Sequence, residues 1–386
     1  MGQELSVGER APTLSLTVLL SANSFWNIRN FRDSLIVALA VKGYRIIIAA
    51  PDADIGWARE NGVEAVEIAI DRAGLNPLRD GRLFFDYLRL FDRYTPDFYL
   101  CYTAKPNIYG SLAARLAGVT SLPNVSGLGT AFINQGPLSR FVGLLYRLAF
   151  RGCPIVFFQN PDDRDLFLAR SIITPRQAQL LPGSGVDLDR FAFAPPPEAG
   201  PPRFLFVGRL LGDKGVREFV EAARLLKTGQ PNWRFQLLGA LDEGNRSGIG
   251  ASELQQWVQD GIVEYLGHAD DVRPHLAAAT AVALPSFREG LPRSLLEAAA
   301  MGRPLVASDV PGNRQLIEHG VNGLLCEARN AQSLAEAIRE IGLMDEDQRR
   351  RMGLAGRELV ERSYGEELVI QAYLDALAQL APAARV

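Results

Sequence analysis

The sequence APPPEAGPP, residues 194–202, divides the 386-residue chain into two halves of similar size. A run of prolines cannot continue a helix or a central strand, so it predicts a stiff linker. A chain of this length is too long for one ordinary core and fits two domains. We therefore expect a first domain over residues 1–193 and a second over residues 203–365. A last helical stretch, residues 366–386, could pack back across the linker on the first domain.

Short apolar runs alternate with helical stretches on both sides of this linker. The predicted strands are Leu14–Leu20, Arg45–Ala49, Glu64–Ile68, Asp97–Cys101, Ser121–Val125 and Ile155–Phe158, then Arg203–Val207, Arg234–Leu238, Val263–Leu266, Ala281–Leu284, Leu305–Ala307 and Gly323–Cys326. Continuous apolar strands indicate sheets that helices cover on both faces, and the alternating order predicts parallel sheets. The fold class is therefore α/β, with two doubly wound, Rossmann-like domains of about six strands each. The carboxyl ends of both sheets should face one cleft, where ligands bind in such folds.

Composition limits the class of protein. Hydrophobic residues make up 47% and charged residues 22% of the chain, as in globular domains. A formal net charge of −3 argues against nucleic acid as a partner. Three widely spaced cysteines form no metal-ligand pattern and favour a reduced, cytoplasmic chain. Charged residues near the amino terminus predict no signal peptide, and every apolar run is too short to span a membrane.

The sequence PSFREGLPRSLLE, residues 285–297, follows the predicted strand Ala281–Leu284 and is the first motif that carries chemistry. Proline is favoured at the first position of a helix, so Pro292 predicts a helix that starts there. The backbone N–H groups of Gly290 and Leu291 would then point from the helix N-terminus toward an anion.

Two glutamates of this motif are candidate ligand-binding residues. Glu289 lies in the loop above the predicted cleft, and Glu297 lies just over one turn into the helix. One carboxylate can accept hydrogen bonds from sugar hydroxyls and the other from a ribose diol. The spacing alone is weak evidence, because Glu358 and Glu366 repeat it. The Glu-Gly-x-Pro loop after a buried strand is the observation that favours a ligand-binding role for the pair.

A second motif, FVGRLLGDKG at residues 206–215, lies between the first strand after the linker and the predicted helix Val216–Lys227. Gly208 allows a tight turn, and Arg209 and Lys214 bring two cations to the same cleft. A departing nucleoside diphosphate gains negative charge as its glycosidic bond breaks, and fixed cations stabilise that charge. A pair of solvated surface cations is the alternative interpretation.

With these two motifs, the chain resembles the retaining family-4 glycosyltransferases of GT-B fold over nearly its whole length. In that family the Gly-Arg-x4-Lys loop binds the donor diphosphate, which implies this role, and a catalytic one, for Arg209 and Lys214. The Glu-x7-Glu motif matches Glu289, which is implied to be catalytic, and Glu297. We expect the donor-binding residues to be Gly208, Arg209, Lys214, His268, Glu289, Gly290, Leu291 and Glu297. His268 follows a predicted strand and is expected to line the base pocket.

Three stretches narrow the resemblance to the branch that holds capsule-type and PglA-like enzymes. They are TAKPNIYG at residues 103–110, QNPDD at residues 159–163 and LPGSGVD at residues 181–187. Members of this branch typically extend polyprenyl-diphosphate-linked saccharides, often with an N-acetylhexosamine. The resemblance therefore implies a UDP-sugar donor, no metal or other cofactor, and a lipid-linked saccharide acceptor.

The acceptor is expected to enter from the first domain, near Asn23, Lys105, Asn107 and Ser126. Many relatives carry a histidine that touches the donor sugar at the position of Ser126. Serine can still form a hydrogen bond to a sugar hydroxyl but cannot act as a base near neutral pH. This departure weakens the assignment of a catalytic group in the first domain.

Basic residues gather in one stretch of the first domain. No acidic residue occurs between Asp97 and Asp162, whereas five basic ones do: Lys105, Arg115, Arg140, Arg147 and Arg151. The last three share a predicted helix with Phe141, Leu144, Leu145, Tyr146, Leu148 and Phe150. A basic, apolar surface suits anionic lipid headgroups or a lipid diphosphate, and predicts a peripheral location on the inner face of the cell membrane. A helix buried on its sheet, with arginines at its ends, is the alternative.

Two other functions share this architecture and stay open from the sequence. A nucleotide-sugar 2-epimerase needs an acid–base set in the cleft, and a non-catalytic nucleotide-sugar-binding subunit fits the serine at position 126. Asp52-Ala53-Asp54 spells the metal-binding Asp-x-Asp motif, but it follows a strand, where aspartate commonly caps the next helix. The first strand–helix turn lacks the glycine fingerprint of dehydrogenases.

Overall fold

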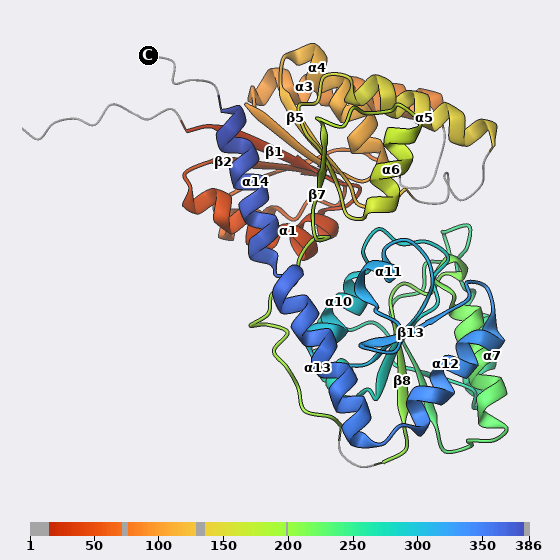
Figure 1. Ribbon diagram of the computed structural model, residues 1–386. Coiled ribbons are helices and arrows are strands. Elements are labelled where there is room, and N and C mark those ends of the chain that lie inside the picture. Colours follow the sequence, from red (N-terminus) through yellow and green to blue (C-terminus); the bar gives the residue numbers. More distant parts are fainter. Residues whose placement is uncertain (1–14, 72–75, 129–135, 198–199, 382–386) are drawn as a thin grey trace, which may run out of the picture.

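The computed structural model describes residues 15–71, 76–128, 136–197 and 200–381 and folds them into two α/β domains, one above the other in Figure 1. The first sheet has the strand order β3-β2-β1-β4-β5-β6-β7 and the second has the order β10-β9-β8-β11-β12-β13. Neighbouring strands are parallel throughout both sheets. The predicted fold class, with two doubly wound sheets, is confirmed.

The first domain alternates strands and helices along the chain. Its strands are β1 (Thr17–Ser21), β2 (Arg45–Ala50), β3 (Glu64–Glu67), β4 (Phe98–Tyr102), β5 (Thr120–Val125), β6 (Val156–Phe158) and β7 (Ala178–Leu180). Its helices are α1 (Phe25–Val41), α2 (Ile55–Glu60), α3 (Pro77–Tyr94), α4 (Ser111–Ala117), α5 (Pro137–Phe150) and α6 (Pro161–Ala169), with a π-helical turn at Pro106–Gly110. Asp54 caps α2 by accepting a hydrogen bond from the Trp57 N–H at 2.9 Å, as its place after a strand predicts.

The second domain repeats the alternation. Its strands are β8 (Arg203–Val207), β9 (Arg234–Leu238), β10 (Glu264–Tyr265), β11 (Ala281–Leu284), β12 (Leu305–Ser308) and β13 (Gly323–Cys326). Its helices are α7 (Val216–Lys227), α8 (Ala251–Gln259), α9 (Arg273–Ala278), α10 (Arg293–Ala300), α11 (Asn313–Leu316), α12 (Ala331–Leu343) and α13 (Glu346–Ser363), with a short 3-10 turn at Gly212–Lys214. The last helix of the chain is α14 (Glu366–Leu380).

The predicted strands match the sheets closely, with one omission. The first sheet has seven strands rather than about six, because the edge strand β7 adds three residues, Ala178–Leu180. This strand is too short and too exposed to leave an apolar run in the sequence. Leu14, linker residues 198–199 and the predicted helical residues beyond 381 lie outside the described part of the chain.

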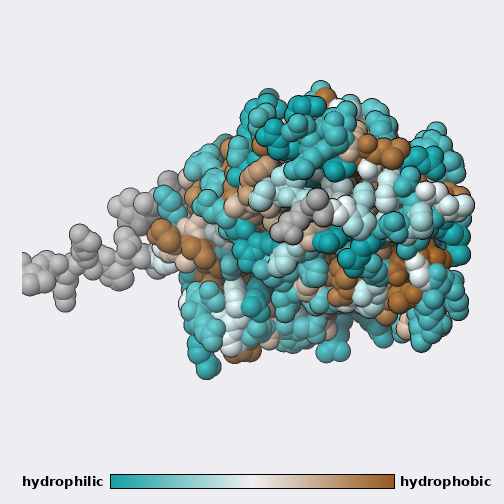
Figure 2. Space-filling view, turned by 90° about the horizontal axis from the view of Figure 1, so that it is seen from below, coloured by the Kyte–Doolittle hydropathy of each residue, from teal (hydrophilic) through white to brown (hydrophobic). Residues whose placement is uncertain are grey.

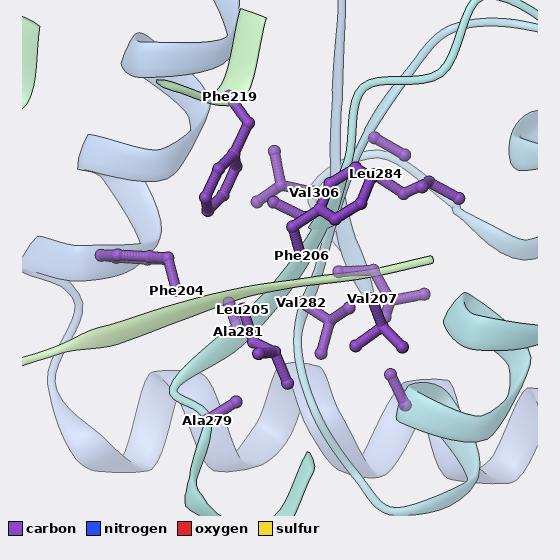
Figure 3. Packing of buried hydrophobic residues seen from close by; sticks show 14 of the residues in the cluster. Phe204, Leu205, Phe206, Val207, Phe219, Ala279, Ala281, Val282, Leu284 and Val306 are labelled. Atoms are coloured by element: carbon purple, nitrogen blue, oxygen red, sulfur yellow. The ribbon is translucent and has the colours of Figure 1, made fainter. Parts of the chain in front are cut away.

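Continuous apolar strands produce a core on both faces of each sheet. Figure 3 shows this packing in the second domain, where side chains of β8, β11 and β12 meet residues from the covering helices. Phe219 of α7 lies against Phe206 of β8, with ring centroids 6.0 Å apart. These buried strands hold their carboxyl ends in place, and the loops that leave those ends carry the two motifs of the second domain.

The chain crosses twice between the domains, and the two crossings are bonded to each other. The Val186 N–H donates to the Tyr364 carbonyl at 3.0 Å, and the Glu366 N–H donates to the Val186 carbonyl at 3.1 Å. Beyond this point α14 packs on the first domain, where it lies beside α1 (Figure 1). Among the described residues, no helix combines the length and the apolarity needed to span a membrane.

Candidate active site

The two motifs of the second domain meet in an ion pair. The Lys214 ammonium donates to both oxygens of the Glu289 carboxylate, at 2.6 and 2.9 Å. The loops behind them are also joined, because the Phe287 N–H donates to the Asp213 carbonyl at 2.9 Å. Gly215 is required for this contact: a Cβ atom there would lie 2.0 Å from the Pro285 carbonyl oxygen. The structure therefore brings a cation and a carboxylate together at the carboxyl ends of β8 and β11.

Arg209 lies on the same loop as Lys214 but points to a different partner. Its guanidinium forms an ion pair with Asp242 at 2.9 Å, and 59% of its side chain is exposed. Gly208, directly before it, donates its N–H to the Leu238 carbonyl at 3.0 Å and so ties the loop to β9. Arg209 is therefore the more accessible of the two predicted cations, and an ion pair on the protein surface exchanges easily for an anionic ligand.

Glu297 is buried in the first turns of α10, where it pairs with Arg293. The Arg293 guanidinium donates to the Glu297 carboxylate at 2.7 Å. Burial raises the pKa of the Glu297 carboxyl, and the charge of Arg293 opposes that shift. Arg293 also donates to the Asn30 carbonyl at 2.5 Å and lies over the Phe31 ring, so it reaches α1 in the first domain. Glu297 thus sits close to the boundary between the domains.

Pro292 caps α10 rather than forming its first residue. Its ψ of 112° is extended, so the helix begins at Arg293, one residue later than predicted. Gly290, two residues before the cap, packs against the first domain: a Cβ atom there would lie 2.0 Å from the Ser126 carbonyl oxygen. The predicted anion-binding N–H groups of Gly290 and Leu291 therefore lie at the domain boundary, and their role stays a prediction.

His268 lies in the loop after β10. Its side chain is 57% exposed and its imidazole is 3.6 Å from the Asp270 carboxylate. The carbonyl of the preceding Gly267 accepts the Gly239 N–H at 2.8 Å, which joins this loop to the end of β9. Its expected role in lining the base pocket stays a prediction.

The predicted acceptor-side residues lie around the carboxyl ends of β1, β4 and β5. Asn107 is buried and donates its amide to the Asn124 carbonyl at 2.8 Å. Ser126, two residues beyond Asn124, is half-buried and faces Gly290, and half-buried Asn23 follows β1. Lys105 is held by a buried carboxylate, because its ammonium lies 2.7 Å from Asp80 on α3. Their roles stay predictions.

Three residues that the sequence did not single out belong to this site. Arg288, next to Glu289, forms an ion pair with the buried Asp163 of the first domain, and Arg293 joins Glu297 to α1. The sequence did contain a signal for Arg288, which directly precedes a predicted ligand-binding glutamate. Asp163 belongs to the stretch QNPDD, which was quoted only because it resembles a branch of the family. Neither signal indicates its partner, because 125 residues separate Arg288 from Asp163.

The arrangement can bind a diphosphate and a polyhydroxylated group at once. Lys214 and Arg209 supply positive charge, Glu289 and Glu297 supply hydrogen-bond acceptors, and all four come from loops or helices at the same edge of the second sheet. Among the described residues, no three histidine, cysteine, aspartate or glutamate side chains gather as they do around a metal ion.

Two family models match this chain, one on each domain. Residues 17–160 match the family described as glycosyl transferase 4-like, and residues 201–342 match the glycosyl transferases group 1 family.

Individual relatives agree with these matches. The chain is 30% identical to the N,N'-diacetylbacillosaminyl-diphospho-undecaprenol alpha-1,3-N-acetylgalactosaminyltransferase of Campylobacter jejuni, over 90% of this chain and 94% of that one. It is 25% identical to the UDP-Gal:alpha-D-GlcNAc-diphosphoundecaprenol alpha-1,3-galactosyltransferase of Escherichia coli, over 68% of this chain and 70% of that one. Among solved structures, the sucrose-phosphate synthase of Thermosynechococcus elongatus has a similar fold, with a TM-score of 0.78, 20% identity and coverage of 95% and 99%.

Proposed function

The chain belongs to the family-4 glycosyltransferases of GT-B fold, and on this premise we propose that it extends a polyprenyl-diphosphate-linked saccharide by one sugar. The donor is a UDP-sugar, and the transferred sugar is an N-acetylhexosamine or a related hexose whose anomeric configuration is retained. The printed names of two relatives support this, because both act on acceptors linked to undecaprenol through a diphosphate. One of those names also specifies a UDP-sugar donor.

The contact between Lys214 and Glu289 carries the proposal. A glycosyl donor has its diphosphate and its sugar hydroxyls on opposite sides of the bond that breaks. Lys214 neutralises the charge that develops on the diphosphate, and Glu289 accepts hydrogen bonds from the sugar hydroxyls. The charged groups of Lys214 and Glu289 are 2.6 Å apart, so the two groups proposed to act on opposite sides of the breaking bond lie at one site.

The remaining residues complete the donor site. Arg209 exchanges Asp242 for the diphosphate, and Glu297 binds the ribose. The acceptor approaches from Asn107 and Ser126, on the first domain. The family implies front-face departure and attack, in which the departing phosphate takes the proton of the acceptor hydroxyl. Exclusion of water by the two domains prevents hydrolysis of the donor.

A lipid-linked acceptor requires the enzyme to work at a membrane surface, and α5 is the element that fits this need. Four apolar side chains are 43–55% exposed on one face of α5: Leu138, Phe141, Leu144 and Leu148. Arg140, Arg147 and Arg151 are exposed beside them, and no acidic residue occurs between Asp97 and Asp162. The opposite face of α5 packs in the core through Val142, Tyr146, Ala149 and Phe150. One face of the helix is therefore buried in the core, and the face toward solvent carries both apolar and basic side chains.

We propose that this side of α5 contacts the anionic inner face of the cell membrane. An exposed apolar row flanked by cations binds anionic bilayers through the combined burial of side chains and attraction of headgroups. Figure 1 shows α5 with α3 and α4 on the outer side of the first domain, and Figure 2 shows the molecule from the end that carries the second domain. At that end hydrophobic residues form only separate patches among hydrophilic ones.

The proposed function is tested by mass spectrometry of products formed from a panel of UDP-sugars and polyprenyl-diphosphate-linked acceptors. Addition of one hexose or N-acetylhexosamine to a lipid-linked acceptor is the expected result. Conversion of the donor without any acceptor would indicate an epimerase instead. Tight binding of a UDP-sugar with no transfer to any acceptor would indicate a non-catalytic binding subunit.

A further inference from the structure

The motif Asn160-Pro161-Asp162-Asp163 contacts the Glu289 loop, although the two belong to different domains. Asn160 and Asp163 are buried at the start of α6, and Asn160 caps this helix by accepting the Asp163 N–H at 2.8 Å. The side-chain amide of Asn160 also donates to the Gly290 carbonyl of the second domain at 2.8 Å. Asn160 thus caps a helix of the first domain and is bonded to a loop of the second.

Arg288 makes a second contact across the same boundary, an ion pair with Asp163. The Asp163 side chain is fully buried and that of Arg288 is mostly buried. Burial raises the pKa of the Asp163 carboxyl, and the charge of Arg288 opposes that shift. The other Asp163 oxygen accepts from the Asn160 amide at 3.1 Å, so both carboxylate oxygens are bonded. A buried carboxylate with both oxygens bonded in this way is a rigid support.

Glu289 lies between the two contacts along the chain. Arg288 precedes it and Gly290 follows it, and each is bonded to the first domain. The Glu289 carboxylate is bonded to Lys214 of the second domain. The first domain therefore holds the Arg288 side chain on one side of Glu289 and the Gly290 backbone on the other, while the second domain holds the Glu289 side chain.

We propose that Asn160 and Asp163 are positioning residues for Glu289, so that the donor sugar is held in the reactive geometry only while the two domains are in contact. This inference rests on the proposed function, because it takes Glu289 as a residue that binds the donor sugar. A reacting group displaced by about 1 Å can cost on the order of 10²-fold in rate, even when the substitution is remote. The diphosphate is also held by Arg209 and Lys214, which neither contact touches directly, so its binding should depend on the two contacts much less than sugar transfer does.

Asn160→Ser is the sharpest test. Serine is as good a helix cap as asparagine, so α6 stays intact, but its hydroxyl is too short to reach the Gly290 carbonyl. We expect kcat for sugar transfer to fall about 10-fold, with the Kd for UDP alone unchanged within threefold. Arg288→Met removes the other contact and is expected to lower kcat about 10- to 100-fold, again with little change in UDP binding.

The chain offers a matched control beside these residues. Arg314 and Asp162 form another ion pair between the domains, 3.4 Å apart, but it is exposed and does not touch the Glu289 loop. Arg314→Met should leave kcat within twofold. If the contacts merely held the domains together, Arg314→Met would resemble Arg288→Met.

The double variant Asn160→Ser/Arg288→Met completes the experiment. Because both contacts act on one loop, its kcat should be higher than the product of the two single effects predicts. Single variants with kcat within twofold of wild type, or with a UDP Kd that weakens as much as kcat falls, would overturn the inference alone. A wild-type protein that transfers no sugar to any lipid-linked acceptor would overturn the proposed function as well. If Arg288→Met fails to fold, Asn160→Ser decides the question.

Discussion

In the proposed donor site, Lys214 is the cation that is bonded to a predicted sugar-binding carboxylate. It is only partly exposed, and its ammonium is bonded to both oxygens of Glu289, so the ion pair fixes its position. A preformed cation contributes more to a developing negative charge than one that has to be ordered during the reaction.

Replacement of Lys214 by alanine is therefore expected to lower kcat about 10²- to 10³-fold, because Arg209, which is bonded to Asp242, does not occupy the position of the lost charge. Steady-state kinetics with the UDP-sugar and a lipid-linked acceptor provide the measurement. Lys227→Ala is the matched control, because Lys227 lies at the far end of α7, where its ammonium donates to the Gly261 carbonyl at the surface. Equal activity of the two variants would contradict the assignment of Lys214.

Glu297 allows a prediction that depends on pH. Its pKa is raised in the folded protein because the carboxyl is buried, so the folded state binds this proton more tightly than the unfolded state does. The corresponding stabilisation is present at low pH and is lost as the pH rises through the folded-state pKa. Relative to wild type, Glu297→Gln should therefore become more stable as the pH increases from 4 to 7.

Urea unfolding at several pH values measures this effect. The same variant should bind the UDP-sugar more weakly, since glutamine cannot replace the carboxylate at the ribose. If the difference in the free energy of unfolding between Glu297→Gln and wild type does not change with pH, folding does not raise the pKa of the Glu297 carboxyl. Glu336→Gln, which removes an exposed carboxylate in α12, serves as the control.

At the scale of elements, α5 has a buried face and an exposed face of different composition. The buried face contacts the core of the first domain, and the exposed face carries apolar and basic side chains without any acidic one. The sequence predicted this helix and its charge but left open whether its apolar residues were all buried. The structure shows that α5 is buried on one face and exposes apolar residues on the other, and its binding to a membrane stays a prediction.

The double variant Phe141→Glu/Leu148→Glu is expected to lower binding to phosphatidylglycerol vesicles at least 10-fold, because it removes apolar burial and repels anionic headgroups. Vesicle co-sedimentation measures this binding, and added salt should weaken the binding of wild type. Transfer to a short-chain, water-soluble acceptor should stay within twofold of wild type.

Leu225→Glu/Val258→Glu provides the matched control for this experiment. These two residues are similarly exposed, at 38% and 42%, but lie on α7 and α8 of the second domain. If both double variants lose vesicle binding equally, α5 is not the membrane-binding element.

At the scale of the whole molecule, α14 joins the end of the chain to the first domain. Its Tyr373 is fully buried, packs on Phe157 with ring centroids 4.7 Å apart, and accepts a hydrogen bond from Asn124 at 2.9 Å. The chain therefore has to pass through the second domain before the core of the first is complete. Buried Arg303 holds the linker to the second domain through the carbonyls of Ala194 and Pro195.

Tyr373→Ala should destabilise the first domain by about 3–5 kcal/mol, because a large aromatic side chain leaves a cavity in the core. Gln371→Ala, on the exposed side of the same helix, should have almost no effect. Thermal unfolding combined with limited proteolysis distinguishes the two domains. Preferential cleavage of the second domain in Tyr373→Ala would contradict this assignment of α14.

The sequence by itself determined the two sheets and the motifs at their edges. Strands such as Arg203–Val207 and Ala281–Leu284 match their predicted bounds, because a continuous apolar run between turn residues is a local signal. The sequence also predicted that the two motifs face the same cleft, since parallel strands bring their carboxyl ends to the same edge of a sheet. Edge strand β7 escaped prediction because three half-exposed residues carry no such pattern.

Only the tertiary structure decided which partner each charged residue takes. Arg209 and Lys214 look alike in the sequence, but one pairs with Asp242 and the other with Glu289, 75 residues away. The contact of Arg288 with Asp163 depends on how two separately folded domains meet. Local patterns encode helices and strands because their interactions lie within a few residues. Contacts between distant residues form only when whole surfaces pack together, so no short stretch of sequence contains them.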